Sequence, residues 1–336
     1  MSELILKDSY SSSLSLRDTQ RAIKLVKDTF EHKLAAALNL ERVSAPLFVT
    51  VKSGINDDLN GVERAVGFDI KNIEGETAVI VHSLAKWKRM ALKMYGFDVG
   101  EGLYTDMNAI RRDEDMDNLH SIYVDQWDWE KIISRDQRSL DFLKATVSKI
   151  VGVFKDTLAI VKESFPAVDT QLSDDIFFIT AQELEDMYPD LTPKQREKAI
   201  TKEKRTVFLM QIGDKLKSGI EHDGRAPDYD DWQLNGDLLF YNDVLEDAFE
   251  VSSMGIRVDE NSMKYQLDAA GKSERSSFEY HKSILNGTLP LTIGGGIGQS
   301  RVCMLLLGKL HIGEVQASIW PEEMLKKCRE NGVDIL

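Results

Sequence analysis

Cysteine is scarce in this chain: its 336 residues include two, Cys303 and Cys328, both close to the C-terminus. Two cysteines so placed are too few for a disulfide framework or a zinc site. The six histidines also lack metal-binding spacing. Two common catalytic patterns are missing as well, the Gly-x-Ser-x-Gly elbow of serine hydrolases and the His-Glu-x-x-His pair of zinc proteases.

Long apolar runs are absent too. No stretch approaches the length that crosses a bilayer, and the first eight residues lack the apolar core of a signal peptide. The net charge of −14 argues against broad binding to nucleic acid or anionic membrane, although it permits a local basic pocket. These absences predict a reduced, cytoplasmic protein. With no repeats or flexible linkers, residues 1–336 are predicted to form a single domain.

Neither of two standard phosphate-binding motifs matches the spacing of the glycines in this chain. The one Walker candidate, Gly271–Ser273, has Gln266 where the first glycine belongs. The dinucleotide fingerprint has Gln299 or Arg301 at its third glycine position, depending on the start.

Two acidic segments suit a positively charged group. Residues 56–61 resemble a calcium loop, but Gly67 stands where the bidentate Glu is expected. Asp57 or Asp58 could still bind an amine. Residues 225–232 are acidic and turn-forming, which fits either an ammonium site or a solvated loop.

The segment Thr292–Arg301 contains four glycines within five residues, and its arginine arrives where a helix is expected to begin. A tight turn before a buried helix would explain the glycines, but the arginine needs an anion or an aromatic face. Upstream, Glu250 and Arg257 lie seven residues apart. Bare backbone, guanidinium groups and a carboxylate are the parts that hold a nucleotide triphosphate with its magnesium ion.

Periodicity predicts the secondary structure. Helices are expected at residues 17–38, 85–95, 140–165, from Thr192 onward, 274–286 and 299–307. Strands are expected at 43–51, 64–70, 77–81, 102–110, 121–128, 176–179, 206–212, 236–241, 248–251 (continued by 255–258) and 315–320. Because strands come in adjacent runs, the predicted fold class is α+β, a largely antiparallel sheet flanked by helices.

Two of these segments suggest a polar pocket. In the expected strand from Ser121, Gln126 and Asp128 share one face and the tryptophans take the other, which fits either a pocket floor or a half-exposed strand. Arg111, between a strand and an acidic loop, could reach a phosphate. Residues 82–89 gather four cationic or titratable groups, which suggests a binding site or a solvated helix face.

Six specific strings, spread over nearly the whole chain, carry a family resemblance: residues 82–89, 100–105, 120–130, 225–232, 245–258 and 292–301. Through them the chain resembles the ammonia-dependent asparagine synthetases, the aspartate–ammonia ligase family. That family is similar to the catalytic core of class II aminoacyl-tRNA synthetases of the aspartyl and asparaginyl type. The resemblance implies the class II fold, and Pro46 looks like the dimer-interface proline, which implies a homodimer.

The resemblance also implies a two-step reaction. The aspartate side-chain carboxylate attacks the α-phosphorus of ATP, which gives β-aspartyl-AMP and pyrophosphate, and ammonia then displaces AMP. Neither cysteine lies at the N-terminus, where a glutamine-hydrolysing module needs its nucleophile, so the nitrogen must come from free ammonia. The alternative is an adenylate-forming synthetase paralogue that acts on RNA or protein. The negative charge and the lack of an added tRNA-binding domain weigh against it.

The family's functional residues carry over to matching positions. Aspartate is expected to contact Lys88, Asp128, Asp230 and Ser253. ATP is expected to contact Arg111, Glu250, Arg257, Gly294, Gly295, Gly296 and Arg301, with Mg²⁺ on Glu250. In this scheme Arg111 holds the α-phosphate, and Arg301 lies against the adenine above a shelf of glycine backbone. Asp57 with Gln126 is expected to hold ammonium and take a proton from it.

Overall fold

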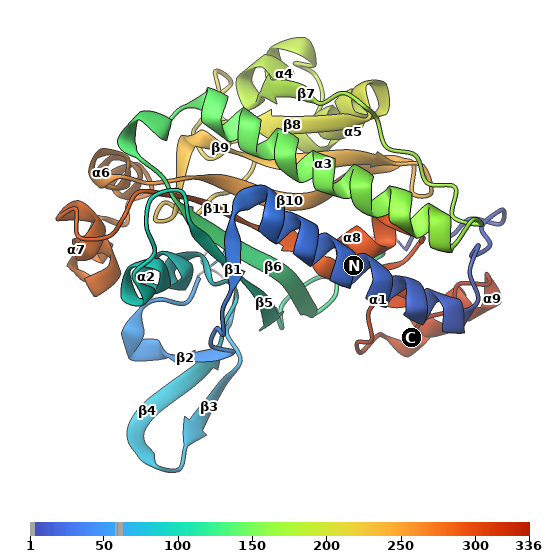
Figure 1. Ribbon diagram of the computed structural model, residues 1–336, viewed down its shortest axis with the longest axis horizontal. Helices are drawn as coiled ribbons and strands as arrows, with labels where there is room; N and C mark the ends of the chain where they lie inside the picture. The colour runs from blue at the N-terminus through green and yellow to red at the C-terminus, as the bar shows by residue number, and fades with distance from the viewer. Residues whose placement is uncertain (1–3, 58, 60–62) are drawn as a thin grey trace.

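The computed structural model describes residues 4–57, 59 and 63–336, and within them eight strands form one sheet (Figure 1). In spatial order the strands are β1 (Leu40–Arg42), β5 (Gly102–Ile110), β6 (Tyr123–Ile132), β11 (Thr292–Gly298), β10 (Asp247–Arg257), β9 (Asp230–Asn242), β8 (Thr206–Met210) and β7 (Phe177–Thr180). The pairs β1–β5 and β7–β8 run parallel, and the other neighbours run antiparallel. The predicted α+β class with a largely antiparallel sheet is confirmed.

A smaller sheet projects from the body of the molecule (Figure 1). It consists of β2 (Phe48–Thr50), β4 (Ile73–Ile80) and β3 (Gly67–Ile70). The strand predicted at residues 43–51 is therefore wrong in extent, because its first half, with Pro46, is irregular chain between β1 and β2.

Two long helices, α1 (Leu16–Leu38) and α3 (Leu140–Ser164), lie side by side across one face of the large sheet (Figure 1). Phe30 of α1 stacks on Trp127 of β6 at 4.7 Å and meets Phe154 of α3 edge-on at 4.8 Å. Both helices begin at serine caps, Ser15 and Ser139, whose side chains accept backbone N–H groups. This face therefore holds the main apolar core, and the opposite face is left for polar side chains.

The remaining helices are shorter: α2 (Ala85–Tyr95), α4 (Ala181–Met187), α5 (Pro193–Lys204), α6 (Glu260–Ala269), α7 (Glu279–Leu285), α8 (Gln299–Leu306) and α9 (Glu322–Glu330). The helix start at Thr192 is confirmed by a capping box that closes between Thr192 and Gln195. None of the helices in the described part of the chain is long and apolar enough to cross a bilayer.

The glycine-rich segment is a strand, not a turn. Residues 292–298 form β11, which lies between β6 and β10 near the middle of the large sheet. Glycine normally weakens strands, so sequence reasoning placed a loop here. In the structure a Cβ on Gly294 would collide with the Glu130 carboxylate, and a Cβ on Gly296 with the Gln126 amide. Gly294 and Gly296 are required because neighbouring strands lay polar side chains across β11.

Two other expectations near the C-terminus are wrong. Residues 315–320 form no strand but follow a 3-10 turn, Ile312–Glu314, as irregular chain. Val315 and Trp320 are nevertheless buried. Buried apolar residues in irregular chain can give the same sequence pattern as a strand. The helix expected at 274–286 divides into a 3-10 turn, Ser273–Ser277, and α7, whereas the α6 helix before it was not predicted.

Candidate active site

A cavity of about 470 Å³ opens over the polar face of β6, β11 and β10. With one exception it is lined by all the residues that the family resemblance assigns to the substrates: Asp57, Lys88, Arg111, Gln126, Asp128, Asp230, Glu250, Ser253, Arg257, Gly295, Gly296 and Arg301. The exception, Gly294, lies beneath Glu130 and Arg257. Asp58, the alternative to Asp57, lies outside the described residues. The structure thus brings together groups that are up to 244 residues apart in the chain, from Asp57 to Arg301.

Strand β6 supplies the floor through its alternation. Trp127 and Trp129 point into the apolar core, whereas Asp128 and Glu130 are buried on the opposite face, with 3 % and 0 % exposed. Across the sheet, Gly296 of β11 pairs with Asp128 of β6 on one side and with Ser253 of β10 on the other. Because glycine has no side chain, β11 leaves the space above this floor open. The prediction that Gln126 and Asp128 share a face is confirmed, and this face is a pocket floor.

Lys88 enters this floor from helix α2. Its Nζ lies 2.7 Å from Asp128 Oδ1 and donates to the Gly295 carbonyl at 3.0 Å. Complete burial lowers the pKa of Lys88 below its usual range, although the negative charge of Asp128 opposes this shift. Lys86 and Arg89 are buried as well, so the solvated basic helix face is excluded.

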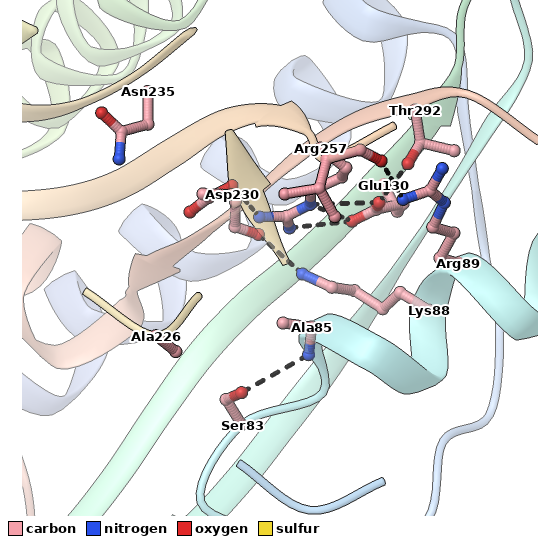
Figure 2. Close-up of polar contacts among 12 residues, drawn as sticks. Ser83, Ala85, Lys88, Arg89, Glu130, Ala226, Asp230, Asn235, Arg257 and Thr292 are labelled. Carbon is pink, nitrogen blue, oxygen red and sulfur yellow. Dashed lines mark hydrogen bonds and ion pairs between the residues drawn. The ribbon is translucent and has the colours of Figure 1, made fainter. Parts of the chain in front are cut away.

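Arg257 lies between two carboxylates, as Figure 2 shows, with Lys88 reaching toward them from α2. Its guanidinium forms hydrogen bonds with both Glu130 oxygens at 2.8–3.1 Å and with Asp230. Thr292 donates to Glu130 at 2.7 Å. Although burial lowers the pKa of Arg257, the two carboxylates raise it well above its usual range. Arg257 is therefore a fixed cation at the bottom of the cavity.

Asp57 is held at another part of the cavity wall. Ser83 donates its hydroxyl to Asp57 Oδ2 at 2.8 Å, and the Leu59 backbone N–H donates to Oδ1 at 3.0 Å. The ring of His82 contacts the Asp57 carbonyl at 3.0 Å. Asp57 is only 4 % exposed yet lines the cavity, so a small ligand can reach its carboxylate while the orientation of the group stays fixed.

The cations at the rim have fewer partners. Arg111 lines the cavity, and none of the described residues forms an ion pair with it; its buried Nε has no hydrogen-bond acceptor. An unpaired guanidinium beside a cavity suits an anionic ligand. Arg301, in the first turn of α8, donates to the Glu250 carbonyl at 2.9 Å. Burial raises the pKa of Glu250, but the nearby charges of Arg301 and Arg225 reverse this and lower it, so the carboxylate is ionised.

Comparison with known proteins decides the family. The sequence model of aspartate–ammonia ligase, AsnA, matches residues 17–332. The chain is 62 % identical over 336 residues to the aspartate–ammonia ligase of Ruminiclostridium cellulolyticum, and the match covers both chains completely. It is 61 % identical to that of Clostridium tetani, over 99 % of this chain and 98 % of the relative.

The chain belongs to the aspartate–ammonia ligase family. The family that the six sequence strings indicated is therefore confirmed.

Solved structures confirm the fold of this aspartate–ammonia ligase family member. Pyrococcus horikoshii asparaginyl-tRNA synthetase, solved with asparaginyl-adenylate, matches with a TM-score of 0.66 at 16 % identity, over 90 % of this chain and 70 % of that chain. The Entamoeba histolytica enzyme, also with asparaginyl-adenylate, gives 0.64 at 13 % identity, over 89 % of this chain and 66 % of that chain. The chain spans about two thirds of these synthetases and shares their catalytic-core fold.

Sequence reasoning missed one acidic group that lies next to this ligase-family cavity, behind Arg225. Asp237 of β9 is buried, pairs with Arg225, and has one oxygen without a hydrogen-bond partner. Burial raises its pKa to about 7, and the charge of Glu250 adds to the shift. Among the described residues no cluster of three metal-ligating side chains exists. However, a carboxylate with a free oxygen beside Glu250 fits Mg²⁺, which takes one or two carboxylates and completes its shell with water and phosphate.

Glu130 and Arg225 were also missed as individual site residues. Glu130 could have been found, because it has the same strand parity as Gln126 and Asp128. Asp237 gave no such signal, since its neighbour Glu250 lies on another strand and the pairing of β9 with β10 brings them together.

Proposed function

We propose that this chain is an ATP-dependent ligase that makes L-asparagine from L-aspartate and ammonia, with β-aspartyl-AMP as the intermediate and AMP and pyrophosphate as products. The observation that carries the proposal is the shared cavity. It places an accessible buried carboxylate, Asp57, and the Lys88–Asp128 pair together with the unpaired Arg111. An amine site, a carboxylate site and a phosphate site are the three that this reaction needs.

Aspartate is expected to bind on the floor. Asp128 and Asp230 would accept its ammonium group, and Lys88 and Ser253 would hold its carboxylates, because each of these side chains reaches the cavity from a different element. The phosphate role predicted for Arg257 stays a prediction. Its deep position between Glu130 and Asp230 also suits a contact with the attacking side-chain carboxylate.

ATP is expected to bind along β11 and β10. Gly295 and Gly296 let the nucleotide approach the strand, Arg301 would contact the adenine, and Arg111 would neutralise charge on the α-phosphate. Mg²⁺, held by Glu250 with Asp237, would screen the negative charge of the phosphates. Transfer to phosphorus needs alignment and charge neutralisation rather than a protein nucleophile, and no cysteine lines this cavity.

Ammonia is expected to bind at Asp57, with Gln126 opposite. The Asp57 carboxylate would attract ammonium and accept its proton, which frees the lone pair that attacks the activated carbonyl. Ser83 and the Leu59 N–H would hold the carboxylate in place during that transfer.

The test is an assay of ATP cleavage with the purified protein. Repeated turnover to AMP and pyrophosphate is expected only when aspartate and ammonium are both present, together with one asparagine for each AMP. Activity that requires tRNA or a protein acceptor would instead support the alternative, an adenylate-forming synthetase paralogue.

The proposed function also carries expectations about the location, oligomeric state and domain organisation of the protein. We expect a cytoplasmic homodimer without a nucleic-acid partner, since the negative charge disfavours a polyanion. We also expect one catalytic domain. The large sheet supports this, because it takes strands from β1 at residue 40 to β11 at residue 298.

A further inference from the structure

Lys194 lies in an electrostatically unfavourable place for a helix residue. It occupies the first turn of α5, after the Thr192 cap and Pro193. The N-terminus of a helix carries partial positive charge, which favours acidic side chains and disfavours a lysine. No acidic residue lies in this first turn. Helix stability alone therefore does not account for a lysine here.

The side chain of Lys194 lines the cavity, although the sequence patterns did not single it out. Its Nζ lies 3.0 Å from Glu197 Oε2, and Glu197 in turn contacts the buried ring of His222 at 2.9 Å. This arrangement fixes the lysine stem on α5 while the ammonium group, on a largely exposed side chain, stays available to a ligand.

The charges around Lys194 belong to the nucleotide end of the cavity. Partial desolvation at the cavity wall lowers the pKa of Lys194, but the carboxylates of Glu197, Glu250 and Asp223 outweigh this and raise it. The same Glu250 is also influenced by Arg301 and Arg225. Three cations from separate segments thus surround Glu250, at the end of the cavity where the phosphates of ATP are expected.

We propose that Lys194 binds the terminal phosphates of ATP and holds the pyrophosphate as it leaves. The proposal rests on the proposed function. In that reaction the aspartate Oδ–Pα bond forms and the bond from Pα to the bridging oxygen breaks, so the electron pair goes to pyrophosphate. The ammonium group of Lys194 stabilises that negative charge and transfers no proton.

Binding measurements test Lys194 independently of turnover. ATP, pyrophosphate and AMP are titrated by calorimetry, with Mg²⁺, into the wild type and the variants Lys194→Ala and Lys194→Arg. Because the side chain is largely exposed, we expect a loss of roughly tenfold in ATP and pyrophosphate affinity for Lys194→Ala. AMP affinity should change less than about twofold, and Lys194→Arg should retain most of the ATP affinity.

Two further variants separate phosphate binding from structure. Lys198→Ala removes a lysine from the same helix that pairs with Asp247 and does not line the cavity, so its ATP affinity should equal that of the wild type. Glu197→Gln removes the partner of Lys194 and should leave ATP affinity unchanged or higher. If Glu197→Gln weakened ATP binding as much as Lys194→Ala, the ion pair would be structural and the proposal overturned. Unchanged ATP binding, or equal losses for ATP and AMP, in Lys194→Ala would also overturn it.

The outcomes for Lys194 and for the overall reaction are distinguishable. A wild type that binds ATP but forms no asparagine refutes the proposed function. The ratio of ATP affinity between the Lys194 variants and the wild type would still test the role of Lys194. A wild type that forms asparagine, with a Lys194→Ala variant that binds ATP normally, refutes the role of Lys194 alone.

Discussion

Replacing Asp57 with asparagine should separate the two chemical steps. Asparagine has nearly the same shape, and its amide oxygen can still accept the Leu59 N–H. The Ser83 hydroxyl, which now donates at 2.8 Å, can turn and accept from the new amide group. The variant should therefore fold normally and lose one property, the negative charge and basicity at the ammonia position.

The expected loss follows from that single change. General-base assistance by one side chain is typically worth about 10²–10⁴-fold, so asparagine formation from ammonium should fall by that factor in Asp57→Asn. Aspartate-dependent exchange of pyrophosphate into ATP needs no ammonia and should fall less than about threefold. Both rates are measured on the same preparation, with radiolabelled pyrophosphate for the exchange and amino-acid analysis for the product.

A matched control makes the result interpretable. Asp113→Asn applies the same substitution to a carboxylate that lines the same cavity but is paired with exposed Arg64, and both rates should stay near the wild-type values. Equal losses of exchange and synthesis in Asp57→Asn would show that Asp57 acts before ammonia enters, and the assignment would be wrong.

Three further predictions concern stability. Gly294→Ala should lower the free energy of unfolding by about 1–3 kcal/mol in urea titrations because its Cβ meets a held carboxylate, whereas Gly152→Ala, where nothing lies within 4 Å, should not destabilise. Lys88→Met should cost about 3 kcal/mol by leaving Asp128 buried without its cation, and adding Asp128→Asn should recover part of that loss; no recovery would contradict a charge effect. Burial lowers the pKa of His311 to about 4, so the folded state binds fewer protons than the unfolded state between that value and 6.5. Stability should therefore be full above pH 6.5 and fall by about 3 kcal/mol as pH approaches 4, and a similar slope in His311→Asn would refute this linkage.

Local patterns predicted the parts of the fold that depend on near neighbours. The apolar spacing from Ile23 to Leu38 gave α1 to within one residue, and the range 102–110 gave β5. The parity of residues 126 and 128 gave their shared face, because alternation is a property of a single strand, but it left open whether that face is a pocket floor.

Features that depend on strand pairing were not predictable. The glycines of β11 look like a turn until β6 and β10 are placed on either side of them. Asp237 joins Glu250 through the register between β9 and β10, and Lys194 reaches the cavity because α5 packs on those strands. No local pattern encodes which distant segments become neighbours. The family resemblance supplied most of the site, since it carries that information from related chains.

Side chains alternate along β6, with Trp127 in the core and Asp128 in the cavity, so folding and catalysis depend on the same strand register. A slip of one residue against β5 and β11 would place indole rings in the cavity and carboxylates beneath α1 and α3. Such a misregistered sheet could neither pack nor bind substrate. The fraction of activity recovered after denaturation and refolding should therefore equal the fraction of molecules in which β6 pairs with β5 and β11 in the native register.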